Sequence, residues 1–402
     1  MLLEERLKVE KKRYLDFIKK HQDKKIYVYG AGKQANALAE FLNKNKIKFN
    51  GFCVTSIKNN RLEENGISVV QIDEINLSNN EVAFLVGVRK QLNDEIIEIL
   101  NHFGYYNILQ STGLIRYLGS YGYNFYTNPM LDITTKIGCS VNCKYCPQHV
   151  FVQEFSRNGA EGNLSLDNFK ICVDKLPKNT LIEFAGFTEP FLNAACINMI
   201  EYAVEKKYKV NIFTTLVGLN DDAFEKMKNI DFEEFVLHVP DEEGYSVIPI
   251  DDIYKKRLME LVNKKKKNGK PYIDYACSQG TVPEEILQIL GNQVRTYIVL
   301  NDRAGNLENL EGKLHEQKNV KGRICCEFAG DINHNELLPD GRVLLCSNDW
   351  GMRHVLGNLL EQDYESIING EEAQRIRQAM CSENGNVLCR NCFHALKEEY
   401  FL

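Results

Sequence analysis

The sequence predicts an α/β protein built from three successive regions. Between residues 24 and 310, short apolar segments alternate with amphipathic helical segments, the pattern of parallel strands joined by crossover helices. From Lys321 onward the chain changes to short segments with many cysteines and tight turns. The length of 402 residues also exceeds what one hydrophobic core commonly organises. We therefore expect a small parallel sheet, a larger strand–helix repeat and a small C-terminal domain, in that order.

The composition argues against several classes of protein. The charge of −6 argues against general nucleic-acid binding, and no apolar segment predicts a membrane span. The first residues are acidic where a secretion signal would be basic and then apolar, so we expect a cytoplasmic protein. Thirteen cysteines in such a chain favour metal or redox chemistry, because a reducing cytoplasm does not support a disulfide framework.

The N-terminal region predicts a helix over residues 1–23 and a small Rossmann-like parallel sheet over residues 24–118. The strand Ile26–Tyr29 runs into Gly30-Ala31-Gly32 and then into a helical pattern. Small residues at such a turn let backbone N–H groups approach an anion at the helix N-terminus. Further strands are expected at 49–54, 67–70, 82–86 and 106–109.

The glycine turn leaves three interpretations open. It holds only two glycines of the dinucleotide fingerprint, and the strand ending near Thr55 lacks the acid that would bind a ribose diol. The domain could bind NAD, bind another nucleotide or nucleotide-sugar, or serve only in packing or oligomerisation. We take Gly30 and Gly32 as candidate cofactor-binding residues. Residues 24–112 resemble the small nucleotide-binding-type domains attached to enzymes of bacterial cell-surface glycans.

Residues 125–310 predict an open, partial (β/α)6 barrel of parallel strands. Six apolar strands are each followed by enough residues for a helix. The strands are expected at 131–136, 181–184, 210–214, 232–238, 272–276 and 297–300. Because chemistry in such barrels takes place at the C-terminal ends of the strands, residues there are the first functional candidates.

Three cysteines follow the first barrel strand in a C-x3-C-x2-C pattern. Cys139, Cys143 and Cys146 lie on one short loop, so their thiolates can bind three irons of a 4Fe-4S cluster and leave the fourth iron open. The alternative is zinc, which would need a fourth nearby ligand such as His149. The spacing, the position after a strand and Tyr145 before the last cysteine favour the cluster.

This motif resembles that of the radical S-adenosylmethionine (SAM) superfamily, and the resemblance covers residues 131–306. It implies that the open iron chelates the amine and carboxylate of SAM. Residues 185–190 resemble the glycine-rich segment whose backbone and acid receive the SAM ammonium group, although Thr188 stands where glycine is common. The third strand ends in a stretch that resembles the one contacting the SAM ribose and carboxylate. The implied cofactor-binding residues are Tyr145, Gly186, Glu189, Pro190, Thr214 and Thr215.

The resemblance also implies a type of reaction. A reduced cluster passes one electron to the sulfonium of SAM, the C–S bond breaks, and a 5'-deoxyadenosyl radical removes hydrogen from an unactivated C–H bond. The cofactors supply this chemistry, while the protein supplies orientation and a dry site. An external one-electron reductant such as flavodoxin or ferredoxin is the implied partner.

A second set of cysteines lies in the C-terminal region, residues 321–402. Asp340-Gly341 is typical of a hairpin turn, which would bring Cys326 and Cys346 together. Cys389 and Cys392, spaced C-x2-C, would complete a four-thiolate site. Zinc is the alternative, because two separated cysteines with a C-x2-C pair are also a common zinc pattern. Neighbouring cysteines that could take part are Cys325 and Cys381.

Residues 326–392 resemble the SPASM/Twitch accessory domain of radical SAM enzymes, and segments 346–351 and 356–359 carry the resemblance. It implies a small iron–sulfur domain with a second 4Fe-4S cluster, and four ligands match the one-cluster Twitch form. The implied ligands are Cys326, Cys346, Cys389 and Cys392. The cysteines within apolar patterns, Cys53, Cys172, Cys196 and Cys277, are expected to be buried.

Five polar residues near strand ends could act in catalysis or position a substrate, namely His238, Asp241, Asp274, Asp302 and Arg303, and the catalytic candidates among them are Arg303 and His238. Arg303 could anchor a phosphate, carboxylate or hydroxyl group of a substrate. His238 could remove a proton during dehydrogenation, although a lone histidine at a strand end is more often structural.

The leading functional hypothesis is radical oxidation, epimerisation or elimination on a sugar, cyclitol or nucleotide-sugar. An auxiliary cluster can accept the electron left on a substrate radical, and the N-terminal region and a similarity to cyclitol dehydrogenases favour a small molecule. The alternatives are maturation of a ribosomal peptide or protein, and a non-catalytic iron–sulfur redox carrier or sensor. A carrier would have no need for an ammonium-binding acid at Glu189.

Overall fold

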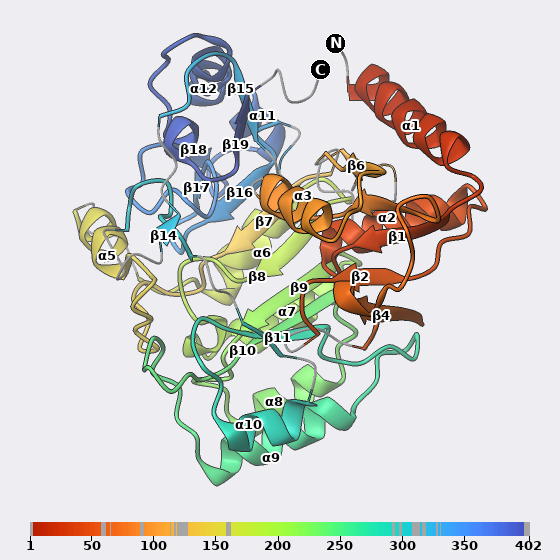
Figure 1. Ribbon diagram of the computed structural model, residues 1–402. Coiled ribbons are helices and arrows are strands. Elements are labelled where there is room, and N and C mark those ends of the chain that lie inside the picture. Colours follow the sequence, from red (N-terminus) through yellow and green to blue (C-terminus); the bar gives the residue numbers. More distant parts are fainter. Residues whose placement is uncertain are drawn as a thin grey trace. The chain divides into compact units, whose positions relative to one another are not determined.

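The computed structural model describes residues 3–57, 62–64, 66–88, 92–112, 114–115, 118, 128–157, 162–291, 294–296, 300–307, 314–315, 319–326, 329 and 331–397. The chain divides into two compact units, one within residues 1–124 and one of residues 125–397 (Figure 1). Both contain parallel sheets with helices, which confirms the predicted α/β class. Among the described helices, none is long and apolar enough to cross a membrane.

The first unit is built on a six-stranded sheet with the order β3-β4-β2-β1-β5-β6. Its pairs are parallel except for the antiparallel β3–β4 pair. The elements are α1 (Leu3–Lys20), β1 (Lys25–Tyr29), α2 (Lys33–Lys44), β2 (Phe52–Val54), β3 (Glu63–Glu64), β4 (Ile67–Gln71), the 3-10 helix η1 (Ile72–Glu74), β5 (Val82–Val86), α3 (Asn93–His102) and β6 (Ile108–Gln110).

Helices α2 and α3 supply apolar side chains to two separate cores of this unit. Leu38 and Phe41 of α2 pack with Val28 of β1, while Leu100 of α3 packs with Phe84 of β5. The two cores stabilise the sheet by removing apolar surface from water.

The second unit is built on a nine-stranded sheet with the order β12-β11-β10-β9-β8-β7-β16-β17-β18. Its strands are β7 (Met130–Ile133), β8 (Leu181–Phe184), β9 (Lys209–Thr214), β10 (Glu234–His238), β11 (Tyr275–Ser278), β12 (Val294–Thr296), β16 (His334–Leu337), β17 (Arg342–Leu344) and β18 (Val355–Asn358). The first six run parallel to one another, and β16 continues the parallel arrangement beside β7. The sheet therefore extends from the predicted barrel into the cysteine-rich region.

The other described elements of this unit are helices, 3-10 helices and short two-stranded sheets. The helices are α5 (Gln148–Ser156), α6 (Leu166–Asp174), α7 (Cys196–Glu205), α8 (Asp221–Lys228), α9 (Asp252–Asn263), α10 (Glu284–Leu290), α11 (Tyr364–Ile368) and α12 (Glu371–Cys381), with 3-10 helices η3 (Pro190–Leu192) and η5 (Leu388–Asn391). The short sheets pair β13 (Leu300–Asn301) with β14 (Leu314–His315) and β15 (Ile324–Cys326) with β19 (Ala395–Lys397).

Polar caps explain where several of these helices begin. The side chains of Ser165, Asn220 and Asp251 accept hydrogen bonds from backbone N–H groups three residues later, at the starts of α6, α8 and α9. Each cap satisfies a donor that has no partner within the helix.

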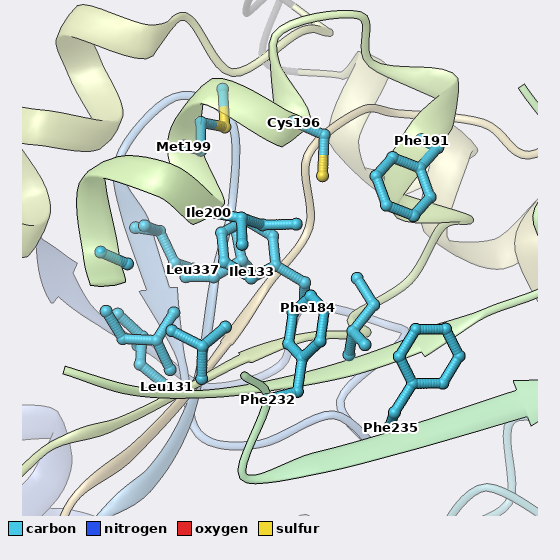
Figure 2. Close-up of a cluster of buried hydrophobic side chains, with 14 of the residues drawn as sticks. Leu131, Ile133, Phe184, Phe191, Cys196, Met199, Ile200, Phe232, Phe235 and Leu337 are labelled. Carbon is cyan, nitrogen blue, oxygen red and sulfur yellow. The ribbon is translucent and has the colours of Figure 1, made fainter. Parts of the chain in front are cut away.

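The core of the second unit lies between the sheet and its helices (Figure 2). Leu131 and Ile133 of β7 and Phe184 of β8 are fully buried, as is Ile200 of α7. Leu337 of β16 joins the same core. Because strand side chains alternate between the two faces, the residues between these apolar positions point to the other face of the sheet.

The sixth strand of the sheet differs from the prediction. It was expected at residues 297–300, but the strand that pairs with β11 is β12, Val294–Thr296. Leu300 belongs to β13 in the separate two-stranded sheet, and residues 297–299 lie outside the described part of the chain. The apolar run therefore predicted a strand in this part of the chain but placed its start at residue 297 instead of residue 294.

The predicted C-terminal hairpin is present. Strands β16 and β17 pair antiparallel, with Glu336 opposite Leu344 and Leu337 opposite Val343. Gly341 has φ +86°, and a Cβ atom there would come within 2.4 Å of Asn358 Oδ1. Both the left-handed conformation and the lack of space require glycine at this turn.

Candidate functional site

The first cysteine set lies on the loop between β7 and α5. Cys139, Cys143 and Cys146 are all half-buried free thiols, and the backbone N–H of Cys146 donates to the Cys143 carbonyl at 3.0 Å. Gly138 at φ +82° and Asn142 at φ +47° shape the loop. These left-handed residues turn the chain within the loop that carries the three thiols.

Several groups donate hydrogen bonds to these sulfurs. The backbone N–H of Glu189 lies 3.4 Å from Cys139 Sγ, and the Gln148 side-chain amide lies 3.7 Å from Cys146 Sγ. Tyr145 bonds through its hydroxyl to Cys143. Hydrogen bonds to thiolate sulfurs are a common feature of iron–sulfur sites, where they tune the reduction potential.

Burial raises the pKa of Cys143 to about 12 and that of Cys146 to about 11. The neighbouring thiols contribute to both of these raised pKa values, so the three sulfurs lie within electrostatic range of one another. The positive charge of Arg303 acts against this at Cys146. Cysteines bind metals as thiolates, so a metal bound here would displace the thiol protons.

The segment that follows β8 connects this loop to the rest of the site. Thr188 Oγ1 donates to the Gly138 carbonyl at 3.1 Å, next to the Glu189–Cys139 contact. Gly186 has φ +57°, and a Cβ atom there would lie 2.6 Å from Thr134 Oγ1. Pro190 begins η3 with Glu189 as its N-cap. The predicted segment 186–190 thus contacts the cysteine loop through Thr188 and Glu189.

The Glu189 carboxylate joins this segment to the end of β9. Its Oε2 accepts from Thr215 N at 2.6 Å and from Thr215 Oγ1 at 2.7 Å, while Oε1 accepts from Thr214 Oγ1 at 2.7 Å and from Phe191 N at 3.3 Å. Burial raises the pKa of Glu189, and these donors act against that rise. The structure therefore brings together the two threonines, the acid and Cys139, which the sequence places far apart.

The two catalytic candidates, His238 and Arg303, also come together. His238 is half-buried at the end of β10, and burial, together with the Arg303 charge, lowers its pKa to about 4. Arg303 and Ala304 have φ values of +51° and +57°, and Gly305 has +80°. Left-handed non-glycine residues often occur at functional sites, where the surrounding structure holds them. Arg303 thus interacts with both His238 and Cys146.

The second cysteine set comes from three elements. Cys326 ends β15, Cys346 follows β17, and Cys389 and Cys392 lie in and after η5. Burial raises the pKa of Cys346 and that of Cys389; Cys389 and Cys392 also raise the pKa of Cys346, and Cys326 and Cys392 also raise that of Cys389. The four predicted ligands are therefore within electrostatic range of one another.

The neighbouring cysteines differ from this set. The Cys325 thiol lies 3.5 Å from the Leu396 carbonyl oxygen on the paired strand β19. Cys381 is exposed at the end of α12. Cys53, Cys172, Cys196 and Cys277 are buried, as predicted. Within the described ranges, no group of three or more His, Cys, Asp or Glu side chains is placed to hold a single metal ion. A 4Fe-4S cluster does not require such a group, because each thiolate binds a different iron and the sulfurs need not meet at one point.

The structure also shows polar residues that the sequence prediction missed. Asp132, Glu183, Asn211 and Glu336 lie on β7, β8, β9 and β16, on the face opposite the apolar core. The Asn211 amide donates to Glu183 Oε2 at 2.9 Å, and His334 Nε2 lies 3.4 Å from Asp132 Oδ2. The sequence did contain a signal for two of the acids, Asp132 and Glu183, because each one lies between two apolar residues of a short strand.

In the first unit, the glycine turn lies between β1 and α2. Gly30 has φ +106°, and a Cβ atom there would lie 3.0 Å from the Gly87 carbonyl oxygen, after β5. Gly32 is the N-cap of α2. The buried Glu64 carboxylate accepts from the Asn36 amide at 3.2 Å, and the same amide contacts the Gly32 carbonyl at 3.1 Å. An acid close to the start of α2 is a feature that the sequence prediction missed.

The cysteine-rich region matches a known family. Residues 325–393 match SPASM, an iron–sulfur cluster-binding domain. This match confirms an iron–sulfur domain at the C-terminal end and contains all four cysteines of the second set. No curated protein matches the chain.

Similar solved structures include three with low sequence identity. BtrN in complex with AdoMet and 2-DOIA is 17% identical, with a TM-score of 0.46, and the match covers 66% of this chain and 93% of that one. SuiB of Streptococcus suis bound to the precursor peptide SuiA is 13% identical, with a TM-score of 0.39 and coverage of 75% and 82%. AnSMEcpe with bound AdoMet and the Cp18Cys peptide is 13% identical, with a TM-score of 0.37 and coverage of 66% and 86%. We therefore base the function on the chain's own residues and on the matched domain.

Proposed function

We propose that the protein is a radical SAM enzyme with an auxiliary 4Fe-4S cluster. The observation that carries the proposal is the set of hydrogen bonds from Cys139 through Glu189 to Thr215, because it places a buried acid and two hydroxyls beside a three-cysteine loop. A redox carrier needs cysteines but has no use for this acid. The SPASM match supports the second cluster.

The residues have separate roles in this proposal. Cys139, Cys143 and Cys146 would hold the first cluster, and Cys326, Cys346, Cys389 and Cys392 the second. When bound, the first cluster and SAM supply a 5'-deoxyadenosyl radical. Glu189 orients the ammonium end of SAM together with the backbone of the 186–190 segment, and Thr214 and Thr215 hold Glu189 in place.

Arg303 and His238 would face the substrate in this proposal. Arg303 provides the positive charge, which suits a carboxylate, phosphate or hydroxyl group. His238 is uncharged at neutral pH because its pKa is about 4, so a ring nitrogen can accept a hydrogen bond from a substrate hydroxyl. Held by its four cysteines, the second cluster would supply a one-electron relay for the substrate radical, taking up an electron in an oxidation or returning one in an epimerisation. We place the strands β7 to β12 in a partial barrel around these groups.

We further propose a sugar, cyclitol or nucleotide-sugar substrate. The sheet of the first unit, with the glycine turn at Gly30 and Gly32, supports a Rossmann-like domain of the kind attached to glycan enzymes. Flavodoxin or ferredoxin would supply the electron. A ribosomal peptide is the alternative substrate, so peptides are compared with sugars and cyclitols in the experiment below.

The test is anaerobic reconstitution followed by iron counting and an assay for 5'-deoxyadenosine. We expect about eight irons per chain, and about four after Cys139, Cys143 and Cys146 are changed to alanine, because each cubane carries four. Cys381→Ser is the matched control and should leave the iron content unchanged. Sugars, cyclitols and peptides are then compared for faster release of 5'-deoxyadenosine. Zinc in the first site, or no 5'-deoxyadenosine with SAM and reductant, would refute the enzyme assignment.

A further inference from the structure

Four polar residues form one row across neighbouring strands of the nine-stranded sheet. Glu336 of β16 is paired with Asp132 of β7, Asp132 with Glu183 of β8, and Glu183 with Asn211 of β9. Adjacent strands lie about 4.8 Å apart, so each side chain neighbours the next on the same face. Glu336 comes from the region that matches the SPASM domain, and its neighbours come from the predicted barrel.

Glu336 reaches the proposed SAM-binding segment through one side chain. Thr134 Oγ1 donates to Glu336 Oε1 at 2.6 Å, and the same Thr134 oxygen accepts from the Phe187 backbone N–H at 2.8 Å. The backbone of Thr134 is fixed as well, because its N–H donates to the Leu337 carbonyl at 3.0 Å. A chain of hydrogen bonds therefore runs from β16 to the residue after Gly186.

The packing at Gly186 supports this connection. A Cβ atom at Gly186 would lie 2.5 Å from Glu336 Oε1 and 2.6 Å from Thr134 Oγ1. The segment therefore lies directly against both side chains, with no room for a larger residue. Two residues later, Thr188 and Glu189 contact the cysteine loop.

The surroundings of Glu336 favour an uncharged carboxyl group. Glu336 is fully buried, and its Oε2 has no hydrogen-bond partner in the described part of the chain, as is also true of Asp132 Oδ1. Burial raises the pKa of Glu336 well above its ordinary value, and the charges of Asp132 and Glu183 raise it further. His334 lies on the same strand as Glu336, and its Nε2 is 3.4 Å from Asp132 Oδ2. A proton on Glu336 would remove one buried charge and supply a donor to a neighbouring carboxylate.

We infer that Glu336 is a positioning residue that acts through the Thr134 hydroxyl to hold the 186–190 segment in its SAM-binding conformation. This inference rests on the proposed function. It adds that a side chain from the SPASM-matched region fixes the SAM site, so the two cysteine-bearing regions are linked by a hydrogen-bond chain as well as by a shared sheet.

The test compares SAM affinity, measured from the change in the cluster spectrum on SAM addition, in Glu336→Gln, Glu336→Leu and Thr134→Val. A glutamine keeps the acceptor for Thr134 and supplies an N–H in place of the carboxyl proton, so we expect affinity within about threefold of the wild type. Leucine and valine each remove one partner of a buried hydrogen bond, and we expect about tenfold weaker SAM binding, which corresponds to about 1.4 kcal/mol. The two losses should not add in the double variant, because both remove the same connection.

Thr180→Val is the matched control. Thr180 is also buried, and its hydroxyl has no hydrogen-bond partner in the described residues, so the variant removes a hydroxyl without breaking a bond. Its SAM affinity should be unchanged. Iron content and thermal midpoint show whether each variant is folded, and if Glu336→Leu does not fold, the SAM affinity of Thr134→Val decides the test.

Two outcomes would overturn the inference while leaving the proposed function intact. One is wild-type SAM affinity in Thr134→Val, and the other is a Glu336→Gln variant as weak as Glu336→Leu. If instead the wild-type protein does not respond to SAM at all, the proposed function itself fails.

Discussion

One oxygen of the Glu189 carboxylate accepts two hydrogen bonds from Thr215, from its backbone N–H at 2.6 Å and from its hydroxyl at 2.7 Å. With the bonds to the other oxygen, all four acceptor sites of the carboxylate are used within the protein. A SAM ammonium group must therefore share or replace one of these donors. In the proposed function, the threonines would hold the carboxylate in the position where it recognises SAM.

We predict that Glu189→Gln weakens SAM binding by at least about tenfold. The substitution removes the negative charge and turns an N–H2 group toward donors of Thr214 or Thr215, which leaves buried donors unpaired. The measurement is a SAM titration of the reconstituted protein. Glu205→Gln, an exposed position on α7, is the control and should bind SAM like the wild type. Unchanged affinity in Glu189→Gln would contradict the role assigned to this acid.

A second prediction separates the two adjacent cysteines of β15. Successive strand residues point to opposite faces, and Cys326 interacts with Cys389 while the Cys325 thiol lies at the Leu396 carbonyl. Cys326→Ser should therefore lower the iron content from about eight toward about four per chain, and Cys325→Ser should leave it unchanged. Iron and sulfide counts after anaerobic reconstitution measure both. The reverse result would mean that Cys325 is the ligand.

Much of the fold could be predicted because local pattern determines it. The strand at Val82–Val86 and the helix from Asn93 are found where apolar periodicity placed them. The fifth strand of the barrel region shows the limit. Tyr272 was predicted to lie in it, and its ring packs against Phe232 and Phe235, yet the strand begins at Tyr275. An apolar pattern predicts which side chains are buried but does not predict which backbone groups form the hydrogen bonds of a sheet.

The parts of the site that could not be predicted depend on long-range pairing. The register that sets His334 beside Met130 joins residues about 200 positions apart, and no local pattern encodes it. Because of it, Glu336 reaches Thr134 and Gly186. The cysteine motifs could be recognised in the sequence because their ligands come from short loops. The row of polar residues from Glu336 to Asn211 could not, because it depends on how the strands pair.

A third prediction concerns the turn before Cys346. Gly341→Ala places a Cβ atom 2.4 Å from Asn358 Oδ1 and 2.5 Å from Leu360 Cγ, in addition to the cost of a left-handed conformation. We expect the hairpin to shift and the second cluster to be lost, with iron falling toward about four per chain while the spectral response to SAM is kept. Gly269→Ala is the matched control, because Gly269 has a similar φ of +82° but open space around it. Equal iron contents in the two variants would show that the close contact at Gly341 has no consequence.

The last prediction follows from the charge state of Glu183. Burial and the neighbouring Asp132 raise the pKa of Glu183 to about 8, well above its value in an unfolded chain. The folded protein therefore holds this proton more tightly than the unfolded chain does. Its contribution to stability is fully present below about pH 4.5 and is lost as the pH rises through about 8.

Between pH 6 and pH 8 this loss amounts to about 2 kcal/mol at most for a single group, from 1.36 kcal/mol per pH unit. Glu183→Gln carries no titrating proton and keeps an oxygen that can face the Asn211 amide. We expect the free energy of unfolding of this variant, measured by urea unfolding followed by circular dichroism under anaerobic conditions, to fall less over that range than in the wild type or in the exposed control Glu205→Gln. Because Asp132 and Glu336 lie beside Glu183 in the row, part of the pH dependence will remain in the variant. An identical pH dependence in all three proteins would mean that Glu183 is already ionised at pH 6. The proton would then be on another carboxyl group of the row.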